Sequence, residues 1–183
     1  QEITEDLFFS YVLPYANLNE TVESWRIDFF NKFYPMVKDM QSAYDAVVFL
    51  NQKIFDELGV IYSTKRPKAD QSPYESINAG MASCTGLSIL LIDVCRSVGI
   101  PARFVGTPSW YNNSGNHSWV EIWDGEWHFT GAAEPTEDRL NESWFEDLAS
   151  SKAEEGSDKY GIFAATWEHT DIYFPMDWLP GVK

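Results

Sequence analysis

The stretch Met81-Ala82-Ser83-Cys84-Thr85-Gly86-Leu87-Ser88 decides the fold, because it places a cysteine where an apolar helix is expected to begin. Gly80 can adopt positive φ and end a preceding helical turn, while Ser83 offers a side-chain oxygen as an N-cap. The apolar run at residues 87–94 follows at once. The pattern therefore predicts a helix that starts at Cys84.

The end of this helix is marked as well. Gly99 suits the C′ position and Pro101 follows it, so the helix is expected to stop just before Gly99. A thiolate at a helix N-terminus faces the positive end of the helix dipole and several unpaired N–H groups, which lower its pKa and can bind an oxyanion. Cys84 is therefore a candidate nucleophile for acyl transfer. The alternative is that it is a small buried residue.

Downstream, the sequence predicts short strands. Residues 102–107 form one, and the alternating residues 117–123 form another. Asp124-Gly125 is a hairpin signal, and residues 126–130 form the return strand. His117 thus stands at a strand end, where an imidazole can face a helix N-terminus. A cysteine and a histidine that meet in a fold are the two parts of a thiolate nucleophile system.

Four ordered stretches carry a resemblance to a known family. They are Ser83-Cys84-Thr85-Gly86, Gly99-Ile100-Pro101-Ala102-Arg103, Asn116-His117-Ser118-Trp119-Val120-Glu121 and Gly125-Glu126-Trp127. Together they resemble the core of the transglutaminase-like superfamily, across roughly residues 71–136. The resemblance implies an α+β fold with a papain-like Cys-His-Asp triad.

The resemblance implies Cys84 as nucleophile and His117 as general base and acid, but the third member departs from the pattern. The family usually has an aspartate four residues after the tryptophan of the return strand, and here that count reaches Gly131. Glu134 can take the role, Asp124 or a backbone carbonyl can orient His117, or the site has no orienting acid. We favour Glu134, because the order Glu-Pro-Thr mimics the usual Asp-Pro-Thr and Gly131 permits a bulge.

Other candidate site residues rest on weaker signals. The side-chain amide of Gln71 can supplement the donors of an oxyanion hole. Trp110 and Tyr111, on the loop before His117, can bind substrate. The histidines and cysteines lack the spacing of metal ligands, and no glycine-rich phosphate loop is present. We therefore expect no metal site and no cofactor.

Length and charge narrow the function classes. A chain of 183 residues with 44% hydrophobic content is long enough for one domain, 1–183, with a mainly helical N-terminal layer over 1–70 and a transglutaminase-like core over 71–183. The 13 basic and 28 acidic side chains give a net charge of −15, which repels phosphate backbones. Nucleic acid is therefore not an expected partner, and the basic cluster at 65–68 is read as a solvated turn.

Helix and strand signals outside the core complete the expected fold. Helices are expected over 19–34, where Pro35 would stop the helix, over 42–58 and over 72–79, and a strand over 160–167. Two cysteines on one helix, Cys84 and Cys95, would lie ~16 Å apart, beyond the ~7 Å limit for a disulfide. Cys95 is expected to be a core thiol. The fold class is α+β, with the cysteine helix packed on an antiparallel sheet and preceded by a helical layer.

The expected function is a cysteine-dependent acyl-transfer enzyme that hydrolyses peptide or amide bonds through a thioester. The alternative is a non-catalytic module that binds a peptide or glycan. The expected partner is a peptide or protein substrate, including a glycan-linked one. The sequence has no transmembrane run and no signal peptide, so membrane insertion is not expected. The chain opens at Gln1 rather than methionine, which is compatible with a processed segment and with export, including to a periplasm.

Overall fold

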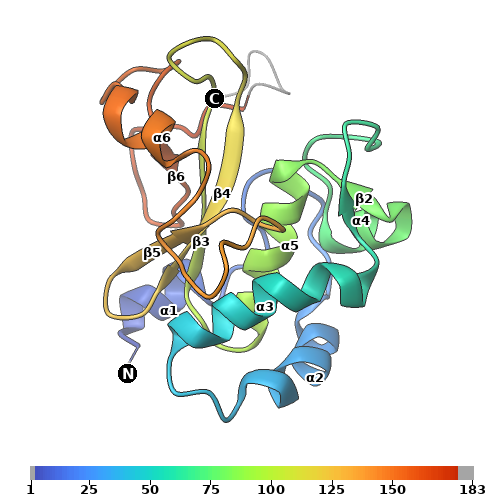
Figure 1. The fold of residues 1–183 in the computed structure, drawn as a ribbon. Helices are drawn as coiled ribbons and strands as arrows, with labels where there is room; N and C mark the ends of the chain where they lie inside the picture. Colours follow the sequence, from blue (N-terminus) through green and yellow to red (C-terminus); the bar gives the residue numbers. More distant parts are fainter. Residues whose placement is uncertain (1–2, 177–183) are drawn as a thin grey trace.

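The cysteine helix lies at the centre of the fold. The computed structural model describes residues 3–176, and in it α5 (Cys84–Ser97) packs against strands on one side and helices on the other (Figure 1). All residues of α5 after Cys84 are buried. A helix buried on every face needs mostly apolar side chains all round, which explains why apolar residues dominate this segment, with the unbroken run Ile89–Ile92 at its centre.

Both ends of α5 lie where the sequence predicts them. The Ser83 side chain accepts a hydrogen bond from the backbone N–H of Gly86 at 3.3 Å, so it caps the helix directly before Cys84. At the other end Gly99 has φ +85°, a left-handed conformation that glycine adopts without steric cost. The helix therefore presents its N-terminal amide groups at Cys84.

A four-stranded antiparallel sheet covers one side of α5. Its strand order is β5-β4-β3-β6, with β3 at Ala102–Thr107, β4 at His117–Trp123, β5 at Trp127–Thr130 and β6 at Phe163–Ala164. In the register of β3 and β4, His117 pairs with Thr107, so the histidine is the first residue of its strand. The predicted hairpin is confirmed, whereas the strand predicted over 160–167 is reduced to the two residues of β6.

The remaining elements form the helical side and the margins of the molecule. Helices α3 (Ala43–Leu58) and α4 (Pro73–Ala79) agree with the prediction, and Ser72 and Glu75 form the expected capping box. The other elements are α1 (Glu5–Tyr11), α6 (Glu146–Lys152) and a two-stranded parallel sheet of β1 (Ile61–Tyr62) and β2 (Met81–Ala82). Within residues 3–176, none of the helices has the length and apolar character needed to span a bilayer.

The prediction for the first long helix was wrong at both ends. Helix α2 spans Arg26–Val37 rather than 19–34. Residues 17–20 do not begin a helix, because the Glu20 carboxylate accepts hydrogen bonds from the backbone N–H groups of Asn17 and Leu18 and holds this segment in another conformation. Pro35 lies within the last turn of α2, so only two helical residues follow it.

Two arginines bind the segment between α1 and α2 to the core. Arg96 of α5 donates to the carbonyl groups of Tyr11 and Ala16 at 3.1 and 3.0 Å, and Arg26 donates to that of Val12 at 2.9 Å. Burial lowers the pKa of Arg96 to about 10, although the nearby Asp93 carboxylate acts in the opposite direction. The N-terminal segment is thus fixed by buried charge-assisted hydrogen bonds as well as by apolar packing.

Candidate active site

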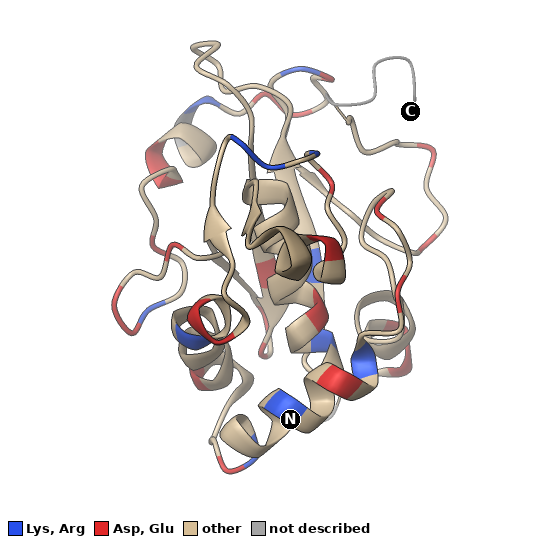
Figure 2. Cartoon of the chain, turned by 90° about the vertical axis from the view of Figure 1, so that its right-hand side faces the viewer, with Lys and Arg blue, Asp and Glu red and all other residues tan. Residues whose placement is uncertain are grey.

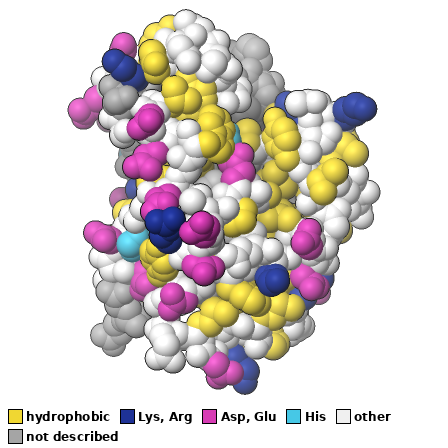
Figure 3. Space-filling model, viewed as in Figure 1, with side chains coloured by type: hydrophobic (Ala, Val, Ile, Leu, Met, Phe, Trp, Pro, Cys, Tyr) yellow, Lys and Arg dark blue, Asp and Glu magenta, His cyan; other side chains and the backbone are white. Residues whose placement is uncertain are grey.

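A cavity of about 480 Å³ opens at the N-terminus of α5. Figure 3 shows a hollow between the side chains over α6 and those over the β1–α4 loop, with hydrophobic side chains on both sides. The cavity is lined by residues from five separate parts of the chain: Tyr62, Arg66, Ala69, Ser83, Cys84, Thr85, Asn116, His117, Glu134 and Trp144. The structure therefore brings the predicted residues Cys84, His117 and Glu134 to one cavity.

Cys84 is the first residue of α5 and is partly exposed to this cavity. Burial raises the pKa of its thiol, but hydrogen bonds from His117 and Ser118 to the sulfur outweigh burial, and the pKa lies below its ordinary value. The other cysteine differs, because complete burial raises the pKa of Cys95 to about 12. Cys84 is therefore the cysteine with thiolate character.

Ser118 is a further partner of the thiol that sequence reasoning missed. Both its backbone and its side chain form hydrogen bonds with Cys84, and these lower the pKa of the thiol. The Ser118 hydroxyl also lies 3.2 Å from that of Thr85, the residue after the cysteine in α5. Ser118 at the start of β4 thus contacts both Cys84 and Thr85 in the first turn of α5.

His117 lies between the thiol and a carboxylate. Its Nε2 is 3.5 Å from Oε2 of Glu134, which leaves Nδ1 as the ring nitrogen for the hydrogen bond with Cys84. The ring packs against Trp144 and Phe145, each with a centroid 4.9 Å away. Burial lowers the pKa of His117, but the interactions with Cys84 and Glu134 outweigh it and raise the pKa to about 9.

The contact between His117 and Glu134 is an ion pair rather than a good hydrogen bond. At 3.5 Å it is longer than the usual N–H···O distance, and Nε2 has no hydrogen-bond partner of ordinary geometry. The Glu134 side chain is 39% exposed, so water screens part of the attraction. The carboxylate still favours the protonated imidazole, because opposite charges at this distance attract.

A tight turn carries Glu134 to the histidine. The backbone N–H of Glu134 donates to the Gly131 carbonyl at 3.1 Å, and Ala133 has φ +61°. A Cβ atom added to Gly131 would lie 2.5 Å from Oε2 of Glu134. The Glu134 carboxylate therefore occupies the space that a side chain at position 131 would need.

Gln71 does not line the cavity. It is 1% exposed, and its side-chain amide donates to the backbone carbonyls of Glu75 at 3.3 Å and Met81 at 3.1 Å. Because an amide nitrogen has two hydrogens, neither is left for an oxyanion. Cys84 and Thr85 line the cavity in the first turn of α5, where backbone N–H groups have no partner within the helix, so these groups remain as candidate oxyanion donors.

Three other predicted residues lie away from the cavity. Trp110 is 5% exposed and packs behind His117 in a buried aromatic cluster with Trp119 and Phe145, so it is not available to a substrate. Tyr111 is exposed but does not line the cavity. Asp124 lies beyond the far end of β4, where its carboxylate accepts from the backbone N–H of Tyr44 at 3.1 Å.

Two cavity-lining side chains had only weak signals in the sequence. Trp144 is 59% exposed and packs against the His117 ring. It lies in an irregular segment, where the sequence has no periodic pattern that would predict its position. Arg66 belongs to the basic stretch on the loop between β1 and α4 (Figure 2), for which the sequence predicts only a solvated turn. Its place in the cavity depends on the pairing of β1 with β2 just before Cys84.

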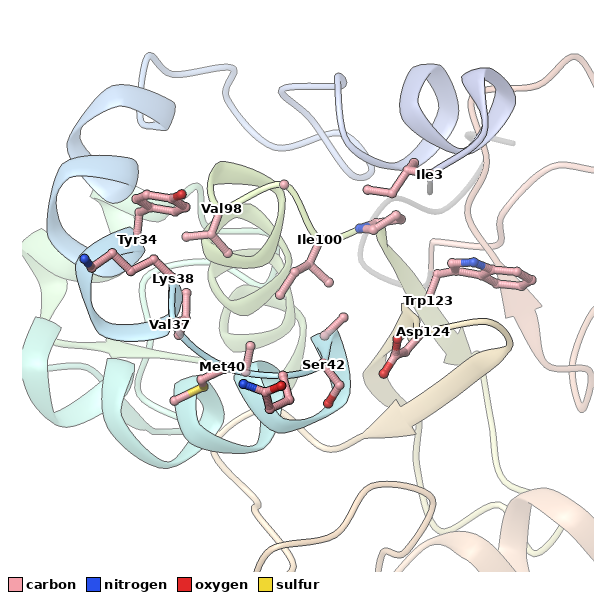
Figure 4. A pocket seen from close by; sticks show the side chains of 15 residues that line it. Ile3, Tyr34, Val37, Lys38, Met40, Ser42, Val98, Ile100, Trp123 and Asp124 are labelled. Carbon is pink, nitrogen blue, oxygen red and sulfur yellow. The ribbon is translucent and has the colours of Figure 1, made fainter. Parts of the chain in front are cut away.

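A second cavity, of about 470 Å³, lies at the opposite end of α5 (Figure 4). Its lining includes Val98 and Ile100, which follow the helix, together with Lys38 and Asp124. It contains neither Cys84 nor His117. Among residues 3–176 there is also no group of three His, Cys, Asp or Glu side chains that could hold a metal ion.

Comparisons with solved structures found chains of related shape. A candidate cysteine protease from Cytophaga hutchinsonii is 19% identical with a TM-score of 0.47, and the match covers 66% of this chain and 47% of that one. The periplasmic domain of TgpA from Pseudomonas aeruginosa is 19% identical with a TM-score of 0.43, covering 61% and 44%. A TGase is 16% identical with a TM-score of 0.48, covering 80% and 45%. The matched part of this chain thus spans less than half the length of each of those chains.

A search of curated proteins found no match. The family model described as the transglutaminase-like superfamily matches residues 34–132. This span includes α3, α5 and strands β3, β4 and β5, and with them Cys84 and His117. That span is more than half of the chain. The protein therefore belongs to the transglutaminase-like superfamily.

Proposed function

We propose that this protein is a cysteine-dependent acyl-transfer enzyme that hydrolyses peptide or amide bonds, with Cys84, His117 and Glu134 as its catalytic residues. The observation that carries the proposal is the hydrogen-bonded pair of Cys84 and His117 at the N-terminus of a buried helix, inside an open cavity. The pKa of the thiol is lowered and that of the imidazole is raised to about 9. Both shifts favour a thiolate–imidazolium pair at neutral pH.

The first half of the proposed reaction forms a thioester. The Cys84 thiolate attacks the carbonyl carbon of the substrate, and the oxyanion that forms faces the free N–H groups at the start of α5. Collapse of this intermediate breaks the C–N bond. The imidazolium of His117 gives its proton to the departing amine, which leaves as a neutral molecule.

The second half releases the acyl group. Water enters the open cavity, and the neutral His117 takes its proton as the water oxygen attacks the thioester. The C–S bond then breaks, so that a carboxylic acid leaves and the thiolate–imidazolium pair is restored. Glu134 stabilises the imidazolium in both halves, since its Oε2 lies on the side of the ring away from the thiol.

One observation favours the alternative, a module that binds peptides or glycans without catalysis. Nε2 of His117 has no hydrogen-bond partner of ordinary geometry, so the third member of the triad is held loosely. Two exposed aromatic side chains, Tyr62 and Trp144, line the cavity and suit stacking against a ligand. The two functions differ in the reactivity of Cys84, which can be measured without a known substrate.

Limited alkylation of the native protein should modify Cys84 and spare Cys95. Iodoacetamide reacts with the thiolate, and only Cys84 combines a lowered pKa with exposure, whereas burial raises the pKa of Cys95 to about 12. Peptide mapping by mass spectrometry after a short exposure gives the site. Preferential labelling of Cys95, or a rate at Cys84 no higher than that of a free model thiol, would contradict the proposed nucleophile.

Hydrolysis should follow a bell-shaped pH profile. As pH rises, kcat/KM should increase while the Cys84 thiol ionises, below the ordinary pKa of a thiol, because its hydrogen bonds favour the thiolate. It should decrease again near pH 9 as His117 loses the proton that the leaving amine needs. A peptide library analysed by mass spectrometry supplies the substrate for this measurement. An alkaline limb near the ordinary histidine pKa would show that Glu134 and Cys84 do not hold the imidazolium.

A further inference from the structure

The turn that bears Glu134 is held from outside the sheet by Asn51 of α3. The Asn51 side chain is 3% exposed, and its amide nitrogen donates to the Thr130 hydroxyl at 3.0 Å and to the Gly131 carbonyl at 2.8 Å. Its amide oxygen accepts from the backbone N–H of Ala133 at 2.9 Å. Both the nitrogen and the oxygen of this one amide therefore bind the turn just before Glu134.

This arrangement fixes a backbone that the local sequence disfavours. Ala133 has φ +61°, which alanine adopts at a steric cost and which persists only where surrounding contacts hold it. The hydrogen bond from the Ala133 N–H to Asn51 is such a contact, and Glu134 follows directly. Without it, residues 131–134 can relax to other turn conformations, and the Glu134 carboxylate then loses its place beside His117.

The distance at the histidine makes this placement consequential. Oε2 of Glu134 is 3.5 Å from Nε2 of His117, which is long for a hydrogen bond. Among the described residues, no acceptor forms a hydrogen bond of ordinary geometry with Nε2. A shift of the turn away from the ring therefore removes the carboxylate's influence on the imidazole, because the attraction weakens with distance and with added water.

We propose that Asn51 is a positioning residue that holds the 131–134 turn and thereby sets the protonation of His117 through Glu134. The proposal rests on the proposed function for its effect on catalysis. Asn51 does not line the cavity, and its hydrogen bonds are to Thr130, Gly131 and Ala133 rather than to the thiol or the imidazole. Its effect on the reaction is entirely indirect, which separates it from the three catalytic residues.

The test compares Asn51 with its neighbour in α3. Asn51→Ala removes all three hydrogen bonds, and Asn51→Leu also removes them but keeps the approximate size of the side chain. Gln52→Ala is the matched control, because Gln52 donates to the Glu137 carbonyl at 2.8 Å, farther along the same loop. NMR titration of labelled histidine gives the pKa of His117 in each protein, and thermal unfolding shows that each variant is folded.

Both Asn51 variants should lower the pKa of His117 from about 9 towards the ordinary histidine value, and Gln52→Ala should leave it unchanged. With a substrate, kcat should decrease by about tenfold to a hundredfold and KM should change by less than about twofold. In a Glu134→Gln background, Asn51→Leu should have little further effect, since both changes act through the same carboxylate.

The outcomes separate this inference from the proposed function. An unchanged His117 pKa in the folded Asn51 variants, with a lowered pKa in Glu134→Gln, would overturn the role of Asn51 and leave the triad intact. An additive loss in the double variant would also overturn it, because Asn51 would then act on something other than Glu134. If Cys84 of the unmodified protein shows no enhanced alkylation, the proposed function fails, whereas the dependence of the His117 pKa on Asn51 still decides the inference.

Discussion

Replacing Cys84 by alanine is expected to reduce kcat/KM for peptide or amide hydrolysis by on the order of 10⁶-fold, the loss that follows removal of a nucleophile in hydrolases with a comparable triad. The proposed mechanism has no route to the thioester without the sulfur. The fold should persist, because Cys84 is only partly buried and the N-cap of α5 comes from Ser83. Discontinuous assays of kcat/KM, with the substrate found by library screening, measure the loss of activity, and circular dichroism shows whether the fold is kept.

Cys95→Ala is the matched control for this variant. It removes a thiol from the same helix, but Cys95 is completely buried and belongs to the main hydrophobic core. Its loss should leave kcat/KM unchanged and lower the free energy of unfolding by about 1 kcal/mol, as expected for a small cavity. Activity that survives in Cys84→Ala, or that is lost in Cys95→Ala while the fold is kept, would contradict the assignment of the nucleophile.

Local signals explain why the core of the site could be predicted from the sequence. The bounds of α5 follow from an N-cap serine and a C′ glycine, and the hairpin from period-two alternation around Asp124-Gly125. These features depend on residues within a few positions of one another. Once α5 packs on β3 and β4, the ends of the helix and strand bring Cys84 and His117 together.

The parts that could not be predicted depend on contacts between distant residues. Gln71 was a reasonable oxyanion donor until the fold placed the carbonyls of Glu75 and Met81 against its amide. Trp110 follows a loop pattern in the sequence, yet it is buried because Phe145 packs against it from the start of α6. Asn51 gave no signal at all, since an asparagine in a helix shows its importance only when the facing turn is known.

Glu134→Gln should reduce kcat by about 10²-fold, at the low end of the range for general acid–base partners. Glutamine keeps the size of the side chain but removes the negative charge that raises the pKa of His117. The loss is expected to be modest because the ion pair is 3.5 Å long and Glu134 is 39% exposed. The alkaline limb of the pH profile should move down from about 9 as the imidazolium loses this support.

Glu137→Gln serves as the control for this change. Glu137 is a carboxylate on the same loop, but it pairs with Arg139 at 3.2 Å on the surface and does not line the cavity. Its replacement should leave both kcat and the pH profile unchanged. Unaltered turnover in Glu134→Gln would show that Glu134 plays no part in catalysis, and an alkaline limb that stays near 9 would assign the raised pKa of His117 to Cys84 alone.

Moving the carboxylate from residue 134 to residue 131 tests whether an acid at either position can act on His117. A side chain on Gly131 would begin 2.5 Å from Oε2 of Glu134, so Gly131→Asp alone should clash with Glu134, place two like charges together and lower activity. Glu134→Ala alone should also lower activity, because the carboxylate is lost. The double variant Gly131→Asp with Glu134→Ala restores a carboxylate without the clash, and its kcat should exceed that of either single variant. A double variant less active than both single variants would show that an aspartate at residue 131 cannot replace Glu134.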